Sequence, residues 1–219
     1  MGVIYMKILN FGSLNIDYVY SVDHFVQKGE TISSSQMNIF SGGKGLNQAV
    51  ALGRAGAKVF HGGRIGKGGE FLVEQLKESG VNTDLVVLDE GCSTGHAIIQ
   101  NDAEGDNCIL LYGGANQRIT KEQIDATLDQ FDAGDYLVLQ NETSNLPYLM
   151  EKAAEKQMKI VLNPSPMDEK IKALPLDKVT LFFVNEIEAA QILGQKELES
   201  TEKAVGAFRA MFPQAAVVL

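Results

Sequence analysis

A glycine-rich turn that contains one lysine is the clearest candidate for chemistry in this sequence. Residues 41–47 read Ser-Gly-Gly-Lys-Gly-Leu-Asn, and an apolar helical pattern begins directly after them. The glycines leave backbone amides open at the positive N-terminal end of a helix, beside Lys44, which suits an anion or a ligand rich in hydroxyl groups. The spacing is not that of a Walker A loop. A plain glycine turn before a helix is the alternative interpretation.

Polar side chains also follow several apolar runs of strand length. In chain order these residues are Asn15, Asp17, Asn141, Glu142, Asn163, Asn185 and Glu188. Ligands of open parallel sheets bind beyond the carboxyl ends of the strands, so the pattern predicts a binding site at that edge. Capping of helices and turns is the alternative, and it would account for about half of the set.

The elements that must position these residues alternate along the chain. Apolar runs of strand length are separated by helical stretches, which is typical of βαβ units and of a mainly parallel sheet covered on both faces. The runs are 7–11, 58–60, 85–88, 136–139, 159–162, 180–184 and 215–219. The sequence therefore predicts one α/β domain.

Two segments break the alternation. Residues 18–40 and 93–112 are rich in β-branched and aromatic side chains, contain no helical stretch, and have turn sequences at 27–29 and 102–105. Both segments are typical of β-hairpins. They predict a small sheet that stands as a lid over the ends of the main strands, within a single domain over 1–219.

Composition excludes several classes of function. The formal net charge of −9 disfavours binding to nucleic acid or to an anionic membrane surface. Cys92 and Cys108 match no metal or redox spacing, and no apolar run approaches the roughly 20 residues of a membrane span, so a cytoplasmic location is expected. The three histidines lack ligand spacing, and we expect each to be a surface or lightly packed residue. They are His24, His61 and His96.

Five short motifs resemble the ribokinase-like (PfkB) family of carbohydrate kinases. Residues 42–49 are similar to the family signature G-G-K-G-x-N-x-A, and residues 15–17 to its N-x-D. Residues 113–116, 163–166 and 185–189 are similar to A-G-A-N, N-P-A-P and N-E-x-E-A, in the family's order. The resemblance extends over essentially the whole chain. It implies a ribokinase-like three-layer α/β/α fold with a small β-sheet lid.

The resemblance also implies an activity and a site. The expected reaction transfers the γ-phosphoryl group of ATP to a primary hydroxyl of D-ribose, which gives D-ribose 5-phosphate. Mg²⁺ and a monovalent cation such as K⁺ would assist, and two copies would pair through their lids. The residues expected to bind ribose are Asn15, Asp17, Gly43, Lys44, Asn47 and Glu142, with Ala97 and Ile99 covering the sugar from the lid. Asn185 and Glu188 would bind nucleotide phosphate, and Glu188 would hold Mg²⁺ through water.

The chain departs from the family pattern in two places. Residues 66–70 read Gly-Lys-Gly-Gly-Glu where relatives often carry G-x-D-x-x-G. The G-A-G-D motif with the catalytic Asp does not occur in residues 1–219, so we expect that Asp beyond Leu219, an incomplete domain, and no activity from these residues alone. The alternatives are a kinase for another sugar or a nucleoside, or a non-catalytic sugar-binding protein if Leu219 is the true terminus.

Overall fold

A seven-stranded sheet forms the centre of the computed structural model, which describes residues 6–219. The strand order is β11-β10-β9-β8-β1-β4-β5, and every neighbouring pair is parallel. The strands are β1 (Ile8–Phe11), β4 (Val59–Lys67), β5 (Asn82–Ser93), β8 (Tyr136–Gln140), β9 (Lys159–Asn163), β10 (Val179–Phe183) and β11 (Ala216–Val218). All seven predicted runs are strands, and β4 and β5 extend well beyond the predicted bounds.

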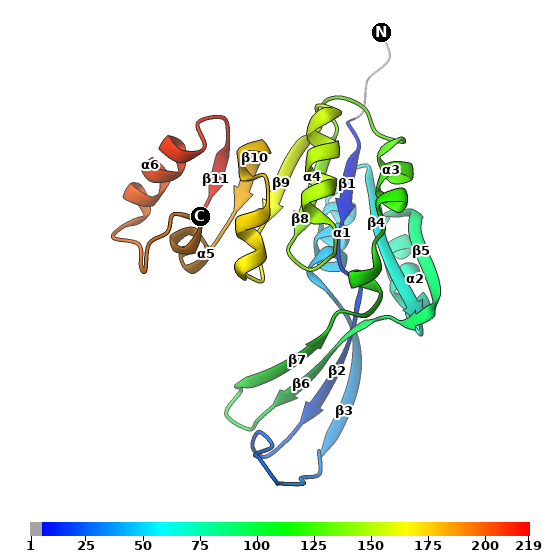
Figure 1. Cartoon of the computed structure of the whole chain (residues 1–219). Coiled ribbons are helices and arrows are strands. Elements are labelled where there is room, and N and C mark those ends of the chain that lie inside the picture. The colour runs from blue at the N-terminus through cyan, green and yellow to red at the C-terminus, as the bar shows by residue number, and fades with distance from the viewer. Residues whose placement is uncertain (1–5) are drawn as a thin grey trace.

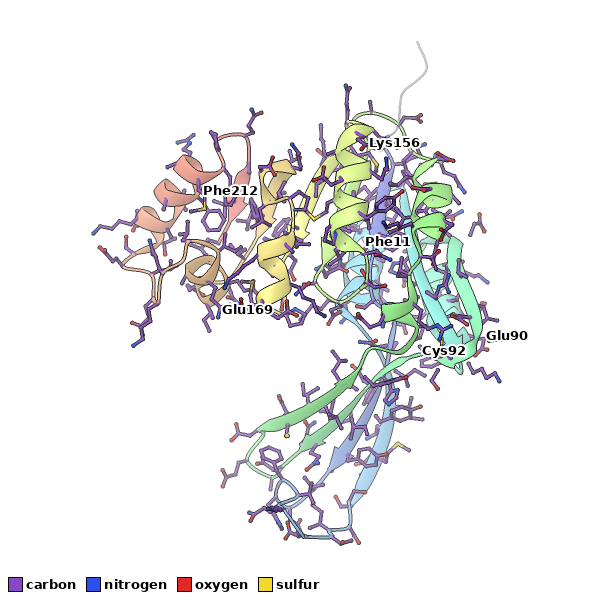
Figure 2. All side chains as sticks on the ribbon, in the orientation of Figure 1. Phe11, Glu90, Cys92, Lys156, Glu169 and Phe212 are labelled. Atoms are coloured by element: carbon purple, nitrogen blue, oxygen red, sulfur yellow. The ribbon has the colours of Figure 1, made fainter. Side chains whose placement is uncertain are left out.

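Helices cover both faces of the sheet, which confirms the predicted three layers (Figure 1). One face carries α1 (Lys44–Arg54) and α2 (Glu70–Glu78), whose apolar residues share a core with β4. The helices of the other core are α3 (Lys121–Leu128), α4 (Leu146–Glu155), α5 (Glu186–Ile192) and α6 (Thr201–Met211). Short 3₁₀ helices are η1 (Gly114–Arg118), η2 (Glu169–Ala173) and η3 (Leu176–Lys178). Phe11 lies inside this body, and Phe212 packs at the end of α6 (Figure 2).

A four-stranded lid stands off the edge at which the main strands end (Figure 1). Its strands are β2 (Asn15–Ser21), β3 (Gln36–Gly42), β6 (Gly95–Asn101) and β7 (Asn107–Tyr112). The order is β3-β2-β6-β7, with antiparallel outer pairs and a parallel central pair. The chain enters the lid directly after β1 and again after β5. Glu90 and Cys92 lie near the end of β5, next to this second entry (Figure 2). The lid is therefore attached at the carboxyl ends of two main strands.

The first lid segment differs from a tight hairpin. The turn predicted at residues 27–29 is present, because the Glu30 amide donates to the Gln27 carbonyl oxygen at 3.0 Å. However, β2 ends at Ser21 and β3 begins only at Gln36, so this turn lies within a long connection. The strands themselves begin at Asn15 and end at Gly42, beyond the predicted limits of 18 and 40.

The sheet leaves apolar surface open on the side that carries α1. The layer of α1 and α2 lies over β1, β4 and β5, and a shallow apolar hollow next to α1 is lined by side chains of β8, β9 and β10. Phe183 and Val218 are 43% and 49% exposed at the β11 edge of the sheet. Among residues 6–219, no helix has the length and apolar character that crossing a bilayer requires.

One expectation about the histidines is wrong. His61 is fully buried on β4, because β4 lies inside the sheet and is covered on both faces. His24 is a surface residue that contacts Glu30, and His96 is partly buried on the lid between Tyr18 and Tyr112. Burial lowers the pKa of His61 to about 4.

Candidate active site

The glycine-rich turn packs directly on the connection between β1 and β2. A Cβ atom on Gly45 would lie 2.4 Å from the Ser13 backbone nitrogen, so a larger residue would push α1 away from this connection. Gly43, which precedes α1, has φ of +95°, a conformation that side chains other than glycine rarely adopt. The glycines of the turn are therefore required by close packing and by backbone conformation.

The backbone amides at the start of α1 are already hydrogen bonded within the chain. The Lys44 amide donates to Glu142 Oε2 at 3.0 Å, and the Leu46 amide donates to the Ser13 carbonyl oxygen at 2.9 Å. The Gly45 amide donates to Ser13 Oγ at 3.2 Å, and that hydroxyl in turn donates to Glu142 Oε2. The expectation that the turn leaves its amides open to a ligand is therefore wrong for Lys44, Gly45 and Leu46. The carboxylate of Glu142 occupies the positive end of the helix.

A second carboxylate lies near Glu142. Asp17 is half-buried on β2, and its carboxylate lies over Gly42, where a Cβ atom would approach Asp17 Oδ2 to 2.1 Å. The pKa of Asp17 is raised, first by burial and then by the negative charge of Glu142. Two carboxylates that lie near one another can accept hydrogen bonds from neighbouring hydroxyl groups of one ligand.

Asn15 is buried beside these carboxylates and is oriented by Asn116 of η1. Asn116 Nδ2 donates to Asn15 Oδ1 at 2.7 Å, and Asn116 Oδ1 accepts from the Leu14 amide at 3.0 Å. Because the oxygen of Asn15 is engaged, its NH₂ group is the part that can donate to a ligand. No role is predicted from the sequence for Asn116 or Ser13, although Asn116 lies within the 113–116 motif.

The lid presents two of the predicted residues to the same face as Asp17. In the β2–β6 pairing, Ala97 stands opposite Asp17, and Ile99 stands opposite Val19 one step further out. Ala97 is buried, whereas Asn47 is exposed on the first turn of α1. The structure thus brings Asn15, Asp17, Gly43, Lys44, Glu142 and Ala97 around the junction of lid and sheet. Their roles, and the pairing of two copies through the lid, stay predictions.

Asn185 and Glu188 lie apart from this group. They follow β10, which is three strands from β1, so they are separated from the junction by about 14 Å of sheet. Asn185 Oδ1 accepts from the Glu188 amide at 2.8 Å, and Glu188 Oε2 accepts from the Asn185 amide at 3.1 Å. This reciprocal pair caps α5. Capping uses the Oε2 oxygen of Glu188, and a role of this residue in holding a metal-bound water stays a prediction.

A complete metal site is not formed by acidic, histidine or cysteine side chains in the part of the chain that the structure describes. No group of three or more such residues lies close enough together there. A Mg²⁺ ion bound to nucleotide takes most of its ligands from waters and phosphates, so the expected contact through Glu188 does not require such a group. Dependence on Mg²⁺ or on a monovalent cation stays a prediction.

Comparison with known proteins decides the family. Residues 6–219 match the model of the pfkB family carbohydrate kinases. The chain belongs to this family. It is 34% identical over 199 residues to a ribokinase of Staphylococcus aureus, and the match covers 87% of this chain and 64% of that protein. It is 28% identical over 193 residues to a deoxyribokinase of Salmonella typhi, covering 86% of this chain and 63% of that protein.

A solved structure supports the same assignment. The ribokinase of Cryptococcus neoformans in complex with ADP is 33% identical, with a TM-score of 0.76, and the match covers 97% of this chain and 71% of that one. The predicted family and fold class are thereby confirmed. The chain spans slightly less than two thirds of the length of the two curated relatives named above.

The loop that departs from the family pattern lies next to the lid. Gly69 precedes α2 and provides no side-chain cap. Thr94, at the start of the lid, is hydrogen bonded to this loop: its hydroxyl accepts from the Gly66 amide at 3.0 Å and donates to the Gly66 carbonyl oxygen at 2.8 Å. Thr94 therefore ties the end of β4 to the second entry into the lid.

Proposed function

We propose that this pfkB family protein transfers the γ-phosphoryl group of ATP to a primary hydroxyl of D-ribose. The observation that carries the proposal is the pair of carboxylates of Asp17 and Glu142 beside the buried amide of Asn15 at the lid junction. Similarity to a ribokinase over most of the chain supports ribose as the sugar. Similarity to a deoxyribokinase makes 2-deoxy-D-ribose the rival substrate.

Each group of the junction would have a separate part in binding. Asp17 would accept from two ribose hydroxyls, Glu142 would accept through its second oxygen, and Asn15 would donate through its NH₂ group. The hydrogen bonds of Glu142 to Ser13 and to the Lys44 amide hold its carboxylate in place before the sugar arrives. Preorganised acceptors lose little freedom on binding, which favours affinity and a fixed orientation of the hydroxyl that is to react.

Transfer itself would depend mainly on positioning and on charge neutralisation, since phosphoryl transfer needs little covalent participation by the protein. The Lys44 side chain, partly exposed beside the junction, would add positive charge near the acceptor hydroxyl. When bound, Mg²⁺ neutralises phosphate charge.

Calorimetric titration with D-ribose, 2-deoxy-D-ribose and adenosine tests the substrate. We expect D-ribose to bind at least about tenfold more tightly than 2-deoxy-D-ribose, because loss of one hydroxyl leaves a half-buried carboxylate oxygen without its donor. D-ribose-dependent release of ADP from ATP, followed in a coupled assay on the whole protein, tests the transfer. If 2-deoxy-D-ribose or adenosine bound more tightly than D-ribose, that compound would replace D-ribose as the proposed substrate.

Glu188 can be tested for a role in magnesium binding separately from its role as a cap. A glutamine at this position can keep both capping bonds, whereas alanine keeps only the bond from its own backbone amide to Asn185 Oδ1. We expect Glu188→Gln to retain thermal stability but to require more Mg²⁺ for half-maximal turnover, and Glu188→Ala to lose about 1 kcal/mol of stability as well. Unchanged magnesium dependence in Glu188→Gln would leave Glu188 with a capping role only.

A further inference from the structure

A small buried polar cluster lies between the sheet and α1, beneath the candidate site. It consists of Asn10, Gln48, His61 and Gln140, and is called the polar cluster below. Asn10 and Gln140 are fully buried on β1 and β8. A strand in the middle of a parallel sheet normally carries apolar residues, as the flanking Leu9 and Phe11 do. An amide at position 10 is therefore an exception that needs a physical explanation.

The cluster is hydrogen bonded to the first turns of α1. Asn10 Nδ2 donates to the Gly45 carbonyl oxygen at 2.9 Å. Gln140 Nε2 donates to Asn10 Oδ1 at 3.1 Å and to Gln48 Oε1 at 2.7 Å. Side-chain amides of β1 and β8 thus form hydrogen bonds to two residues of α1, Gly45 and Gln48.

The end of β8 holds this helix from a second direction. Gln140 is the last residue of β8, and Glu142, two residues later, accepts from the Lys44 amide. The start of α1 is bound at its first amide by Glu142 and at the Gly45 carbonyl by Asn10. Gly12 leaves no free space there, because a Cβ atom on it would lie 2.1 Å from Gln140 Oε1 and 2.7 Å from the Gly45 Cα atom.

The polar cluster is poorly suited to stabilise the fold. Within residues 6–219, Gln140 Oε1 and both ring nitrogens of His61 are buried without a hydrogen-bond partner. Buried polar groups that are incompletely satisfied destabilise a core relative to apolar residues of similar size. Such groups can, however, hold the elements that they join in one defined arrangement.

We propose that Asn10 and Gln140 are positioning residues, which fix the first turn of α1 so that Lys44 and Glu142 face the sugar in a single arrangement. This inference rests on the proposed function for the identity of the ligand. The positioning itself is a property of the chain without ligand. Asn10 and Gln140 touch no substrate and act through Gly45 and Gln48.

Amide hydrogen exchange of the full chain tests the positioning without any ligand. In Asn10→Leu we expect the amides of residues 44–46 to exchange about tenfold faster than in the wild type, with unchanged exchange in α4 and an unchanged or higher melting temperature. A role in stability alone would instead accelerate exchange throughout the molecule. Gln48→Ala, at a partly exposed helix position, removes one acceptor of Gln140 with little risk to folding, and should show the same local effect more weakly.

His61→Leu is the matched control. It removes a buried polar side chain that stands beside Asn10 in the sheet but makes no hydrogen bond to α1 in the described structure. In His61→Leu we expect the amides of residues 44–46 to exchange as they do in the wild type. The proposal would be overturned if these amides also exchanged at the wild-type rate in both Asn10→Leu and Gln48→Ala.

Sugar titration links the positioning to the site. We expect the dissociation constant for D-ribose to rise about tenfold in Asn10→Leu and to stay unchanged in His61→Leu. If the wild type itself binds no D-ribose, the proposed function fails, while the exchange data still decide whether Asn10 positions α1. Faster local exchange with unchanged ribose affinity would overturn the link between the polar cluster and the sugar site.

Discussion

Asp17→Asn is expected to weaken D-ribose binding by about 10–100-fold, which corresponds to the roughly 1–3 kcal/mol that an unsatisfied buried partner costs. The carboxylate can accept from two hydroxyls, whereas an amide at the same place presents one oxygen and one NH₂ group. The NH₂ group would then oppose a hydroxyl donor. Calorimetric titration at neutral pH measures the change.

Two comparisons separate this effect from a general loss of structure. Asp106→Asn changes the same chemical group on the exposed turn between β6 and β7 and should leave ribose affinity unchanged. In the wild type, affinity should fall as the pH is lowered through the raised pKa of Asp17, because the protonated carboxyl loses acceptor capacity. Equal affinity of Asp17→Asn and the wild type would remove Asp17 from the sugar site.

The main sheet could be predicted from the sequence because apolar runs and helical stretches alternate, and because parallel strands end at a common edge. Because parallel strands end at a common edge, Asn15 and Asp17 could be predicted to lie near the junction of lid and sheet. The 42–49 signature placed Lys44 there as well. These features depend on residues close together in the chain, and local patterns are what a sequence displays most directly.

The partners of the site residues could not be predicted in the same way. Glu142 and Lys44 are 98 positions apart, and Asn116 and Asn15 are 101 apart. Nothing local in the sequence indicates that a carboxylate will cap α1 from β8. The parallel pairing of β2 with β6 joins two lid segments that the sequence presents as separate hairpins.

His61 illustrates the same limit in one residue. Its neighbours in sequence are Phe60 and two glycines, and the predicted run ends at Phe60, so His61 lies outside the predicted strand. The observed β4 continues to Lys67, so His61 falls within a covered strand, opposite Asn10. A histidine at such a place has to be neutral, because burial disfavours the charged imidazolium.

The buried His61 is expected to make the protein lose stability in acid. Its pKa is about 4 in the folded protein, against the ordinary value of 6.5 that applies to the unfolded chain. Between these two values the unfolded chain binds a proton that the folded protein does not. Stability is therefore fully present above pH 6.5 and falls as the pH is lowered toward 4. The difference in pKa corresponds to about 3 kcal/mol at most.

Urea unfolding of the wild type and of His61→Leu at pH 7 and pH 4.5 measures this contribution. Carboxyl groups also titrate in this range, but they are common to both proteins, so their effect cancels in the comparison. We expect the wild type to lose about 2–3 kcal/mol more than His61→Leu between the two pH values. An identical loss in the wild type and in His61→Leu would mean that His61 is protonated in the folded protein or accessible to water.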